Sequence, residues 1–159
     1  MKVTTLTRFA FGFGLALGLR EGLGPSPAMA QPAPTYTVTN LGTLGGDSFA
    51  LDINLRGQIV GTCRTPGGNE QAFLYSGGVM ADLGTLGGGR SQANGINTRR
   101  QVVGWAYPAL GTKHAFLFEN GVMTDIRATF SGESIATDID EFGRVVGYYD
   151  APGGSQPFR

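Results

Sequence analysis

The fold is decided by Gln71–Gly88, which reads QAFLYSGGVMADLGTLGG and returns from His114 as HAFLFENGVMTDIRATFS. A second motif recurs as well: INLRGQIVG (Ile53–Gly61) returns as INTRRQVVG (Ile96–Gly104) and IDEFGRVVG (Ile139–Gly147), each 43 residues on. Self-similarity at this period is typical of stacked all-β repeats such as propeller blades. The sequence therefore predicts tandem repeats of 42–43 residues. They comprise a partial unit at 36–48, unit one at 49–91, unit two at 92–134 and a truncated unit three at 135–159.

Each complete unit is expected to hold four short strands. The second strand is QIVG, QVVG or RVVG, β-branched residues bounded by turn formers. The third, AFLY at Ala72–Tyr75 or AFLF at Ala115–Phe118, is apolar throughout, which predicts a strand buried on both faces. The fourth, VMADL at Val79–Leu83, alternates as a half-buried strand does. An isolated copy of the fourth strand is predicted at Tyr36–Leu44.

Turn residues support this division. Asn54–Gly57 and Asp140–Gly143 place an Asx side chain first and a glycine fourth, which is typical of a type I turn whose glycine adopts positive φ. Unit two has Arg100 at that glycine position, and we expect its left-handed conformation to cost about 1 kcal/mol. Gly77–Gly78 and Asn120–Gly121 are predicted to form the tight hairpin turns before the fourth strands.

Units of this kind resemble propeller blades, and an ordinary propeller needs roughly 4–8 of them to surround its channel. Two complete units and one truncated unit are too few, so three arrangements stay open. The chain is a partial propeller cut from a longer repeat protein; or copies of it assemble through exposed strand edges; or it closes as a threefold β-trefoil-like structure, which also uses three units of four strands.

Composition excludes several classes of function. Charged residues make up only 15% of the chain, while 27 glycines and 41% hydrophobic residues indicate a β-rich, turn-rich fold rather than disorder. Without its first 30 residues the chain carries nine Lys and Arg residues against eleven Asp and Glu residues. This balance excludes a basic nucleic-acid footprint and a polybasic patch for membrane surfaces.

The N-terminus has the three parts of a secretory signal peptide. Lys2 and Arg8 precede the apolar run Phe9–Leu19, and a small-x-small pattern follows at Ala28–Ala30. The run has eleven residues, well short of the ~20 that span a bilayer. The sequence thus predicts a signal peptide at 1–30, cleavage after Ala30, a secreted, periplasmic or cell-surface β-repeat domain at 31–159, and no membrane span in the mature chain.

The repeated segments HAFLFENGVMTD, QAFLYSGGVMADLGTLGG and IN-x-x-G-Q-V-V-G resemble the HAF repeat of extracellular bacterial proteins. That repeat is named after the triplet found here at His114–Phe116, and the resemblance covers nearly all of Leu41–Phe158. Gln71 and Gln156 stand where the histidine would be, and Pro157 replaces the alanine. The resemblance implies an exported tandem-repeat β protein, and it implies no established reaction, cofactor or catalytic residue.

Side chains suited to catalysis are few. His114, the only histidine, stands where the other units have glutamine, which favours a hydrogen bond to a neighbouring strand over a general base. Asp82 and Asp125 are equivalent to Asn40, and this repetition favours a bond to a turn. Cys63, the only cysteine, is expected to be a small half-buried strand residue without an intrachain disulfide. We predict no catalytic residue, no metal site and no cofactor.

The variable loops are the better candidates for function. Loops are expected at Thr62–Glu70, Trp105–Lys113 and Tyr148–Ser155, all on the same side of the repeats. Binding commonly resides in loops on a rigid scaffold, and aromatic rings suit sugar rings or protein partners. The alternative is that these rings only cap the ends of the β core. The candidate ligand-binding residues are Trp105, Tyr107, Tyr148, Tyr149, Arg64 and Asp150.

These observations predict an exported, non-enzymatic β-repeat protein that serves as a scaffold for binding an extracellular glycan or protein. Self-association through exposed strand edges is a further expected mode of interaction. Two alternatives stay open: a fragment of a propeller-type enzyme acting on extracellular glycans, and a truncated gene product without an activity of its own.

Overall fold

The computed structural model describes residues 35–126 and 132–159, so the predicted signal peptide lies outside the described residues. The described residues contain eleven strands and no helix, which confirms the all-β prediction. Nothing in these two ranges has the helical length and apolar character needed to cross a bilayer.

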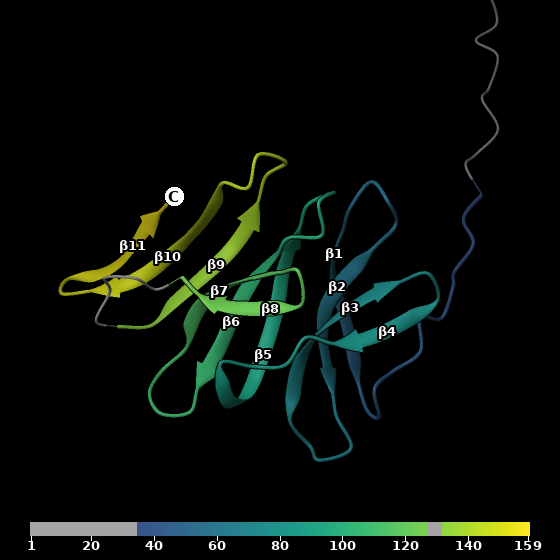
Figure 1. The fold of residues 1–159 in the computed structure, drawn as a ribbon, viewed down its shortest axis with the longest axis horizontal. Helices are drawn as coiled ribbons and strands as arrows, with labels where there is room; N and C mark the ends of the chain where they lie inside the picture. The colour runs from purple at the N-terminus through teal and green to yellow at the C-terminus, as the bar shows by residue number, and fades with distance from the viewer. Residues whose placement is uncertain (1–34, 127–131) are drawn as a thin grey trace, which may run out of the picture. The chain divides into compact units, whose positions relative to one another are not determined.

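The strands form three antiparallel sheets that follow the chain order (Figure 1). From here on a unit means the strands of one sheet, so that unit two begins at Gly87 and unit three at Ser134. The sheet of unit one contains β1 (Ser48–Ile53), β2 (Ile59–Arg64), β3 (Glu70–Ser76) and β4 (Val79–Asp82). The sheet of unit two contains β5 (Gly87–Ile96), β6 (Val102–Pro108), β7 (His114–Glu119) and β8 (Val122–Asp125). The sheet of unit three contains β9 (Ser134–Ile139), β10 (Val145–Ala151) and β11 (Gly154–Phe158). Each sheet is open, and the described residues form no closed barrel.

The first hairpin of each unit carries a β-bulge. In unit two the bulge lies between Ala93 and Gly95 of β5, opposite the end of the QVVG motif in β6. Gly104 lies there, and a Cβ at this position would be 1.9 Å from the carbonyl oxygen of Gln92. The sequence suggested this glycine as a turn former at the end of the strand. It lies instead inside β6, where the bulge brings the neighbouring backbone too close for a side chain.

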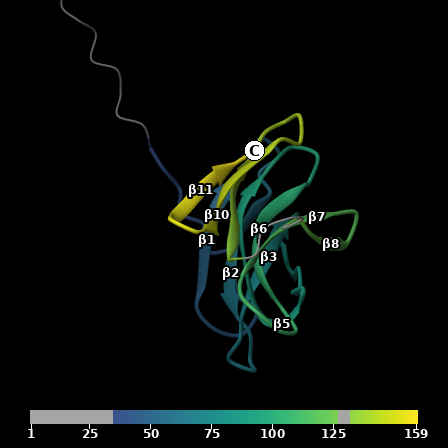
Figure 2. The same ribbon diagram turned by 90° about the vertical axis from the view of Figure 1, so that its left-hand side faces the viewer.

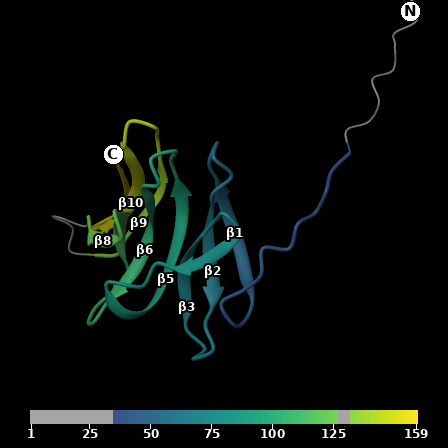
Figure 3. The same ribbon diagram turned by 45° about the vertical axis from the view of Figure 1, so that its right-hand side comes forward.

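The sheets pack one behind the other, with a hydrophobic core at each junction (Figure 3). We call the face that meets the preceding unit the front face of a unit, and the face that meets the following unit its back face. The first core includes Val60, Ala72 and Leu74 of unit one with Ala93, Ile96 and Val102 of unit two. The second includes Val103 and Ala115 of unit two with Ala136 and Ile139 of unit three.

Strand β7 contributes to both cores, as its apolar sequence predicted. Phe116 belongs to the first core and Ala115 to the second, and the two residues are 0% and 1% exposed. Successive side chains of a strand point to opposite faces. The prediction that AFLF is covered on both sides is therefore confirmed.

An asparagine ladder crosses both junctions. The Asn54 Nδ2 donates to the carbonyl oxygen of Asn97 at 2.9 Å, and the Asn97 Nδ2 donates to the carbonyl oxygen of Asp140 at 3.0 Å. The same amides donate to Gln58 and Gln101 within their own units, at 2.9 and 2.7 Å. The turn asparagines, which the sequence explained by local backbone geometry, thus also hold neighbouring units together.

A serine at the start of the following unit adds a second link. The Ser91 Oγ accepts the N–H of Ala72 at 2.9 Å and donates to the carbonyl oxygen of Gly84 at 2.5 Å. The Ser134 Oγ accepts the N–H of Ala115 at 3.0 Å. Both serines are buried, so the junctions enclose polar groups whose hydrogen bonds are made.

The predicted turns are confirmed. Gly57 and Gly143 have φ values of 70° and 83°, and Arg100 adopts the same left-handed conformation with φ of 64°. Asn120 also has a positive φ, of 51°, in the hairpin between β7 and β8. The isolated strand predicted at Tyr36–Leu44 was wrong, because no strand begins before Ser48 in the described residues. A lone strand has no neighbour to take up its backbone hydrogen bonds.

Candidate functional site

The six candidate residues, which were predicted to lie in loops, all lie in strands. Trp105 and Tyr107 belong to β6, and Tyr148, Tyr149 and Asp150 belong to β10. Arg64 is the last residue of β2. The hairpins extend farther than expected: β6 pairs with β7 from Val102 to Ala106, because aromatic residues suit a pleated, half-buried surface. The turns themselves are short.

The structure brings Trp105 and Tyr107 together. Their ring centroids are 5.9 Å apart and the rings meet edge to face at 87°. Residues two apart in a strand share a face, which explains the contact. The Lys113 ammonium lies 5.2 Å from the centroid of the Trp105 ring, within the range of a cation–π interaction. We call Trp105, Tyr107 and Lys113 the aromatic corner.

A charged group lies in unit one and the start of unit two. Glu70 at the start of β3 accepts a hydrogen bond from the Arg90 guanidinium, and the Arg64 Nη2 lies 3.7 Å from its other oxygen. The hydrogen bond from Arg90, followed by the charges of Arg90 and Arg64, lowers the pKa of Glu70 against the effect of burial. The pKa of Arg90 is raised mainly by Glu70, with a small contribution from Tyr107 of the aromatic corner.

The remaining candidates lie in the sheet of unit three. Tyr148 is 41% exposed, whereas Trp105, its equivalent in unit two, is half-buried. Asp150 accepts a hydrogen bond from the Ser155 Oγ at 3.0 Å across the end of the β10–β11 hairpin. The six predicted residues are therefore spread over three sheets, and the ring contact joins only Trp105 and Tyr107 among the described residues.

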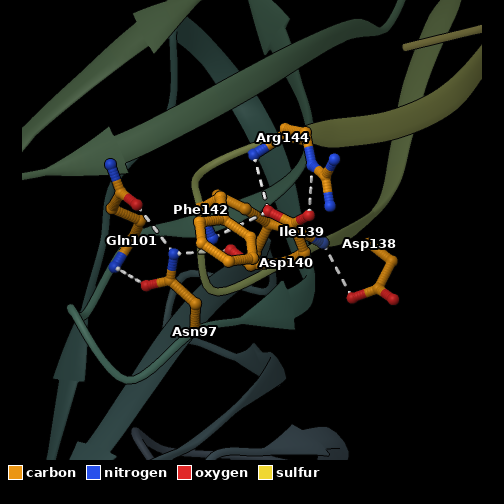
Figure 4. Close-up of polar contacts among 7 residues, drawn as sticks. All are labelled: Asn97, Gln101, Asp138, Ile139, Asp140, Phe142 and Arg144. Atoms are coloured by element: carbon orange, nitrogen blue, oxygen red, sulfur yellow. Dashed lines mark hydrogen bonds and ion pairs between the residues drawn. The ribbon is translucent and has the colours of Figure 1, made fainter.

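The sequence reasoning missed a hollow of about 300 Å³ on unit three, formed by Asp138, Ile139, Asp140, Arg144, Val146 and Arg159. Figure 4 shows the centre of this group: the Arg144 Nε donates to the Asp140 Oδ2 at 2.5 Å, and the guanidinium lies 5.3 Å from the Phe142 ring centroid. Hydrogen bonds from the Arg144 backbone N–H and guanidinium and from the Phe142 N–H lower the pKa of Asp140. A sequence signal existed, because Asp140 and Arg144 replace the Asn–Gln pairs of units one and two.

His114 is buried, and its Nδ1 lies 2.6 Å from the Asp125 Oδ2. This contact ties β7 to β8 and confirms the predicted hydrogen bond from His114 to a neighbouring strand, although the sequence did not identify Asp125 as its partner. Asp82 and Asn40 make the turn bonds that were predicted for the equivalent positions: they accept the N–H groups of Gly84 and Gly42 at 2.8 and 2.9 Å.

Cys63 is a fully buried residue of β2. Its sulfur is within hydrogen-bond distance of the Ser48 Oγ (3.0 Å), the Leu44 N–H (3.1 Å) and the Thr43 Oγ1 (3.4 Å). Burial raises the pKa of the thiol, but these hydrogen bonds together outweigh it and lower the pKa. The cysteine thereby anchors the segment before β1 to the sheet of unit one.

Within residues 35–126 and 132–159 there is no group of three or more His, Cys, Asp and Glu side chains that could hold a metal ion. Comparison of the chain with models of protein families, with curated proteins and with solved structures gave no match.

Proposed function

We propose that the chain is an exported, non-enzymatic repeat protein of the HAF type, whose blade-like units form a partial propeller that binds an extracellular glycan. The proposal takes the signal-peptide pattern at 1–30 and the resemblance of the repeats as its basis for location and family. Three similar sheets, stacked through buried cores and hydrogen-bonded junctions, supply the rigid scaffold on which binding residues are held in place.

The aromatic corner is the single observation that carries the choice of ligand. Trp105 and Tyr107 form two walls nearly at right angles, and Lys113, whose ammonium lies over the Trp105 ring, adds hydrogen-bond donors. The Lys113 Nζ lies 3.8 Å from the Glu133 carboxylate, which supplies acceptors in the same region. An apolar ring face flanked by charged donors and acceptors fits a sugar ring, whose faces are apolar and whose rim carries hydroxyl groups.

The hollow of unit three gives less support to a glycan-processing enzyme. Asp138 and Asp140 both line it, but a glycosidase needs one carboxyl group whose raised pKa keeps it protonated. Hydrogen bonds lower the pKa of Asp140, which is the opposite direction.

Retention on insoluble polysaccharide tests the proposal. The folded chain and the variant Trp105→Ala/Tyr107→Ala are incubated with chitin, cellulose and peptidoglycan, and the unbound fraction is measured. We expect the double variant to bind at least about tenfold more weakly, as loss of an aromatic anchor implies. Phe142→Ala is the matched control, because Phe142 is an aromatic residue that is 80% exposed and lies in the turn between β9 and β10, outside the aromatic corner. Equal retention of the folded double variant, or no retention of the original chain on any of the three, contradicts the proposal.

A further inference from the structure

The front face of unit one has the residues of a junction but no sheet covering it among the described residues. Ile53 is 61% exposed, whereas its equivalents Ile96 and Ile139 are each 5% exposed inside the two junctions. Ala50 is exposed as well, whereas the equivalent Ala93 and Ala136 are both fully buried. This part of unit one is built like a surface that another unit covers.

The segment before β1 has the structure of a linker between units. Between units one and two, the Asp82 Oδ1 accepts the Gly84 N–H, and the Thr85 Oγ1 accepts the Gly87 N–H at 3.1 Å. Before unit one the same two bonds recur, from Gly42 to Asn40 and from Gly45 to Thr43, at 2.9 and 3.1 Å. The segment before β1 therefore has the same hydrogen bonds as the linker that connects β4 of unit one to β5 of unit two.

An acceptor of the ladder is also in place on unit one. The carbonyl oxygen of Asn97 accepts both the Arg100 N–H and the Asn54 amide, and that of Asp140 accepts both the Gly143 N–H and the Asn97 amide. The carbonyl oxygen of Asn54 accepts the Gly57 N–H at 2.9 Å and, among the described residues, makes no second hydrogen bond. A side-chain amide donated by a preceding unit would complete the pattern.

The back face of unit three does not supply that amide. Asp140 occupies the position that asparagine has in the ladder of units one and two. Its carboxylate has no N–H to donate to a following unit, and its Oδ2 accepts a hydrogen bond from Arg144. Val146 on the back face of unit three is 41% exposed, and unit three is the sheet nearest the viewer in Figure 2, with no other sheet in front of it. Placed against unit one of another copy, Asp140 would direct a carboxylate oxygen at the Asn54 carbonyl oxygen.

A second mismatch between the back face of unit three and the front face of unit one comes from Asp52 and Asp138, the acidic residues next to the β-bulges. Each internal junction has one acid at this position: Asp52 faces unit two and accepts the Ile96 N–H at 2.8 Å, and Asp138 faces Gly95, where a Cβ would lie 3.0 Å from its Oδ1. Asp138 also lines the hollow beside Val146 on the back face of unit three, so stacking unit three on unit one would place two acids, Asp138 and Asp52, at one junction. Like charges at an interface disfavour the wrong partner.

From these contacts we infer that the front face of unit one binds the back face of a repeat unit that carries the Asn–Gln pair. Asp138, Asp140 and Arg144 exclude unit three of a second copy from that place. The partner is defined by its chemistry: an apolar Ala/Val sheet face with a side-chain amide that donates to the Asn54 carbonyl oxygen. Because the back face of unit three does not fit the front face of unit one, copies of the chain do not stack head to tail into filaments.

The test gives unit three the chemistry of unit two in the full chain. In the variant Asp138→Gly/Asp140→Asn/Arg144→Gln, all three positions carry the residues of unit two, Gly95, Asn97 and Gln101. We expect the original chain to keep the mass of one copy in sedimentation equilibrium, and the triple variant to form head-to-tail assemblies with a dissociation constant at least about tenfold lower. Asp140→Asn alone, a change at an exposed turn, gives a smaller shift in the same direction.

Ile53→Asp, added to the triple variant, should restore the mass of a single copy, because it places a charge on the front face. Val79→Asp is the matched control, since Val79 is 66% exposed and lies on β4. The inference is overturned if the folded triple variant keeps the mass of one copy, if the original chain already assembles through Ile53, or if Val79→Asp dissolves the assemblies as well as Ile53→Asp does. The aromatic corner is unchanged in every variant, so polysaccharide retention is an independent measurement.

Discussion

The substitution Asn97→Asp tests whether the asparagine ladder holds the units together. Asn97 is 1% exposed, and its Nδ2 donates to Gln101 and to the Asp140 carbonyl at 2.7 and 3.0 Å. Its Oδ1 accepts the N–H groups of Arg99 and Gln101, at 3.0 and 3.1 Å. A carboxylate keeps the accepted bonds and loses the donated ones, so that it faces two acceptor oxygens inside the junction.

The magnitude follows from these contacts. The Asp140 carbonyl keeps the Gly143 N–H, so the Gln101 Oε1 is the acceptor that loses its donor, at a cost of about 1–3 kcal/mol, and a buried charge without a partner costs about 3–5 kcal/mol. We therefore expect the free energy of unfolding to fall by about 4 kcal/mol at pH 7. With an m-value near 2 kcal/mol/M, the urea midpoint falls by roughly 2 M. The introduced carboxyl has a raised pKa in the folded state, so protonation restores a donor and the loss is smaller at acidic pH.

Urea unfolding followed by circular dichroism at pH 7 and pH 4.5 measures the effect. Asp140→Asn is the reverse change at the equivalent, exposed position, and its midpoint should barely move. Asn97→Asp/Gln101→Arg transplants the pair found in unit three and should recover about 1 kcal/mol of the loss. A midpoint for Asn97→Asp within about 0.5 M of the original chain at pH 7 would refute the reasoning. If the variant unfolds at pH 7, the measurement at pH 4.5 supplies the comparison.

Other positions give independent checks. Ile96→Ala should lower the free energy of unfolding by about 3 kcal/mol because Ile96 is 5% exposed, whereas Ile53→Ala, at 61% exposure, should cost under about 1 kcal/mol; equal costs in thermal denaturation would contradict the assignment of the junction. Arg100→Gly should stabilise the chain by about 0.5–1 kcal/mol, because φ at this position is 64°, and an unchanged melting temperature would show that Arg100 carries no strain. The pKa values of Glu70 and Asp140 lie below their usual 4.5 and 3.8, so their contribution to stability is present at neutral pH and is lost as the pH falls below about 4.5. When the free energy of unfolding is measured against pH, the variant Glu70→Gln/Asp140→Asn should therefore lose less stability in acid than the original chain. An equal loss would show that other groups cause the acid destabilisation.

Local chemistry made much of the fold predictable. The recurring Ala-Phe-Leu motifs and the β-branched motifs indicated strands, and the Asx and glycine residues indicated turns, because each signal acts over a few residues. Even the positive φ of Arg100 followed from alignment of the units. The isolated strand at Tyr36–Leu44 failed because pairing, unlike propensity, depends on a neighbour that the sequence does not specify.

The candidate site was harder to predict because it depends on distances between units. The Asn97 side chain was explained by its own turn, and its second bond reaches a carbonyl 43 residues away. Trp105 was placed in a loop because the length of a hairpin depends on its cross-strand partners. The contact between His114 and Asp125 depends on the register of β7 against β8, which places the end of one strand near the start of the other.

The serine links also make two backbone amides into reporters on the junctions. The N–H groups of Ala72 and Ala115 point to hydroxyl groups of the following unit, whereas their neighbours in β3 and β7 pair within their own sheets. Fraying of a hairpin therefore leaves these two amides protected, and their hydrogen exchange with deuterated solvent requires that adjacent sheets part. Comparing the exchange of the two amides would show which of the two junctions opens more readily.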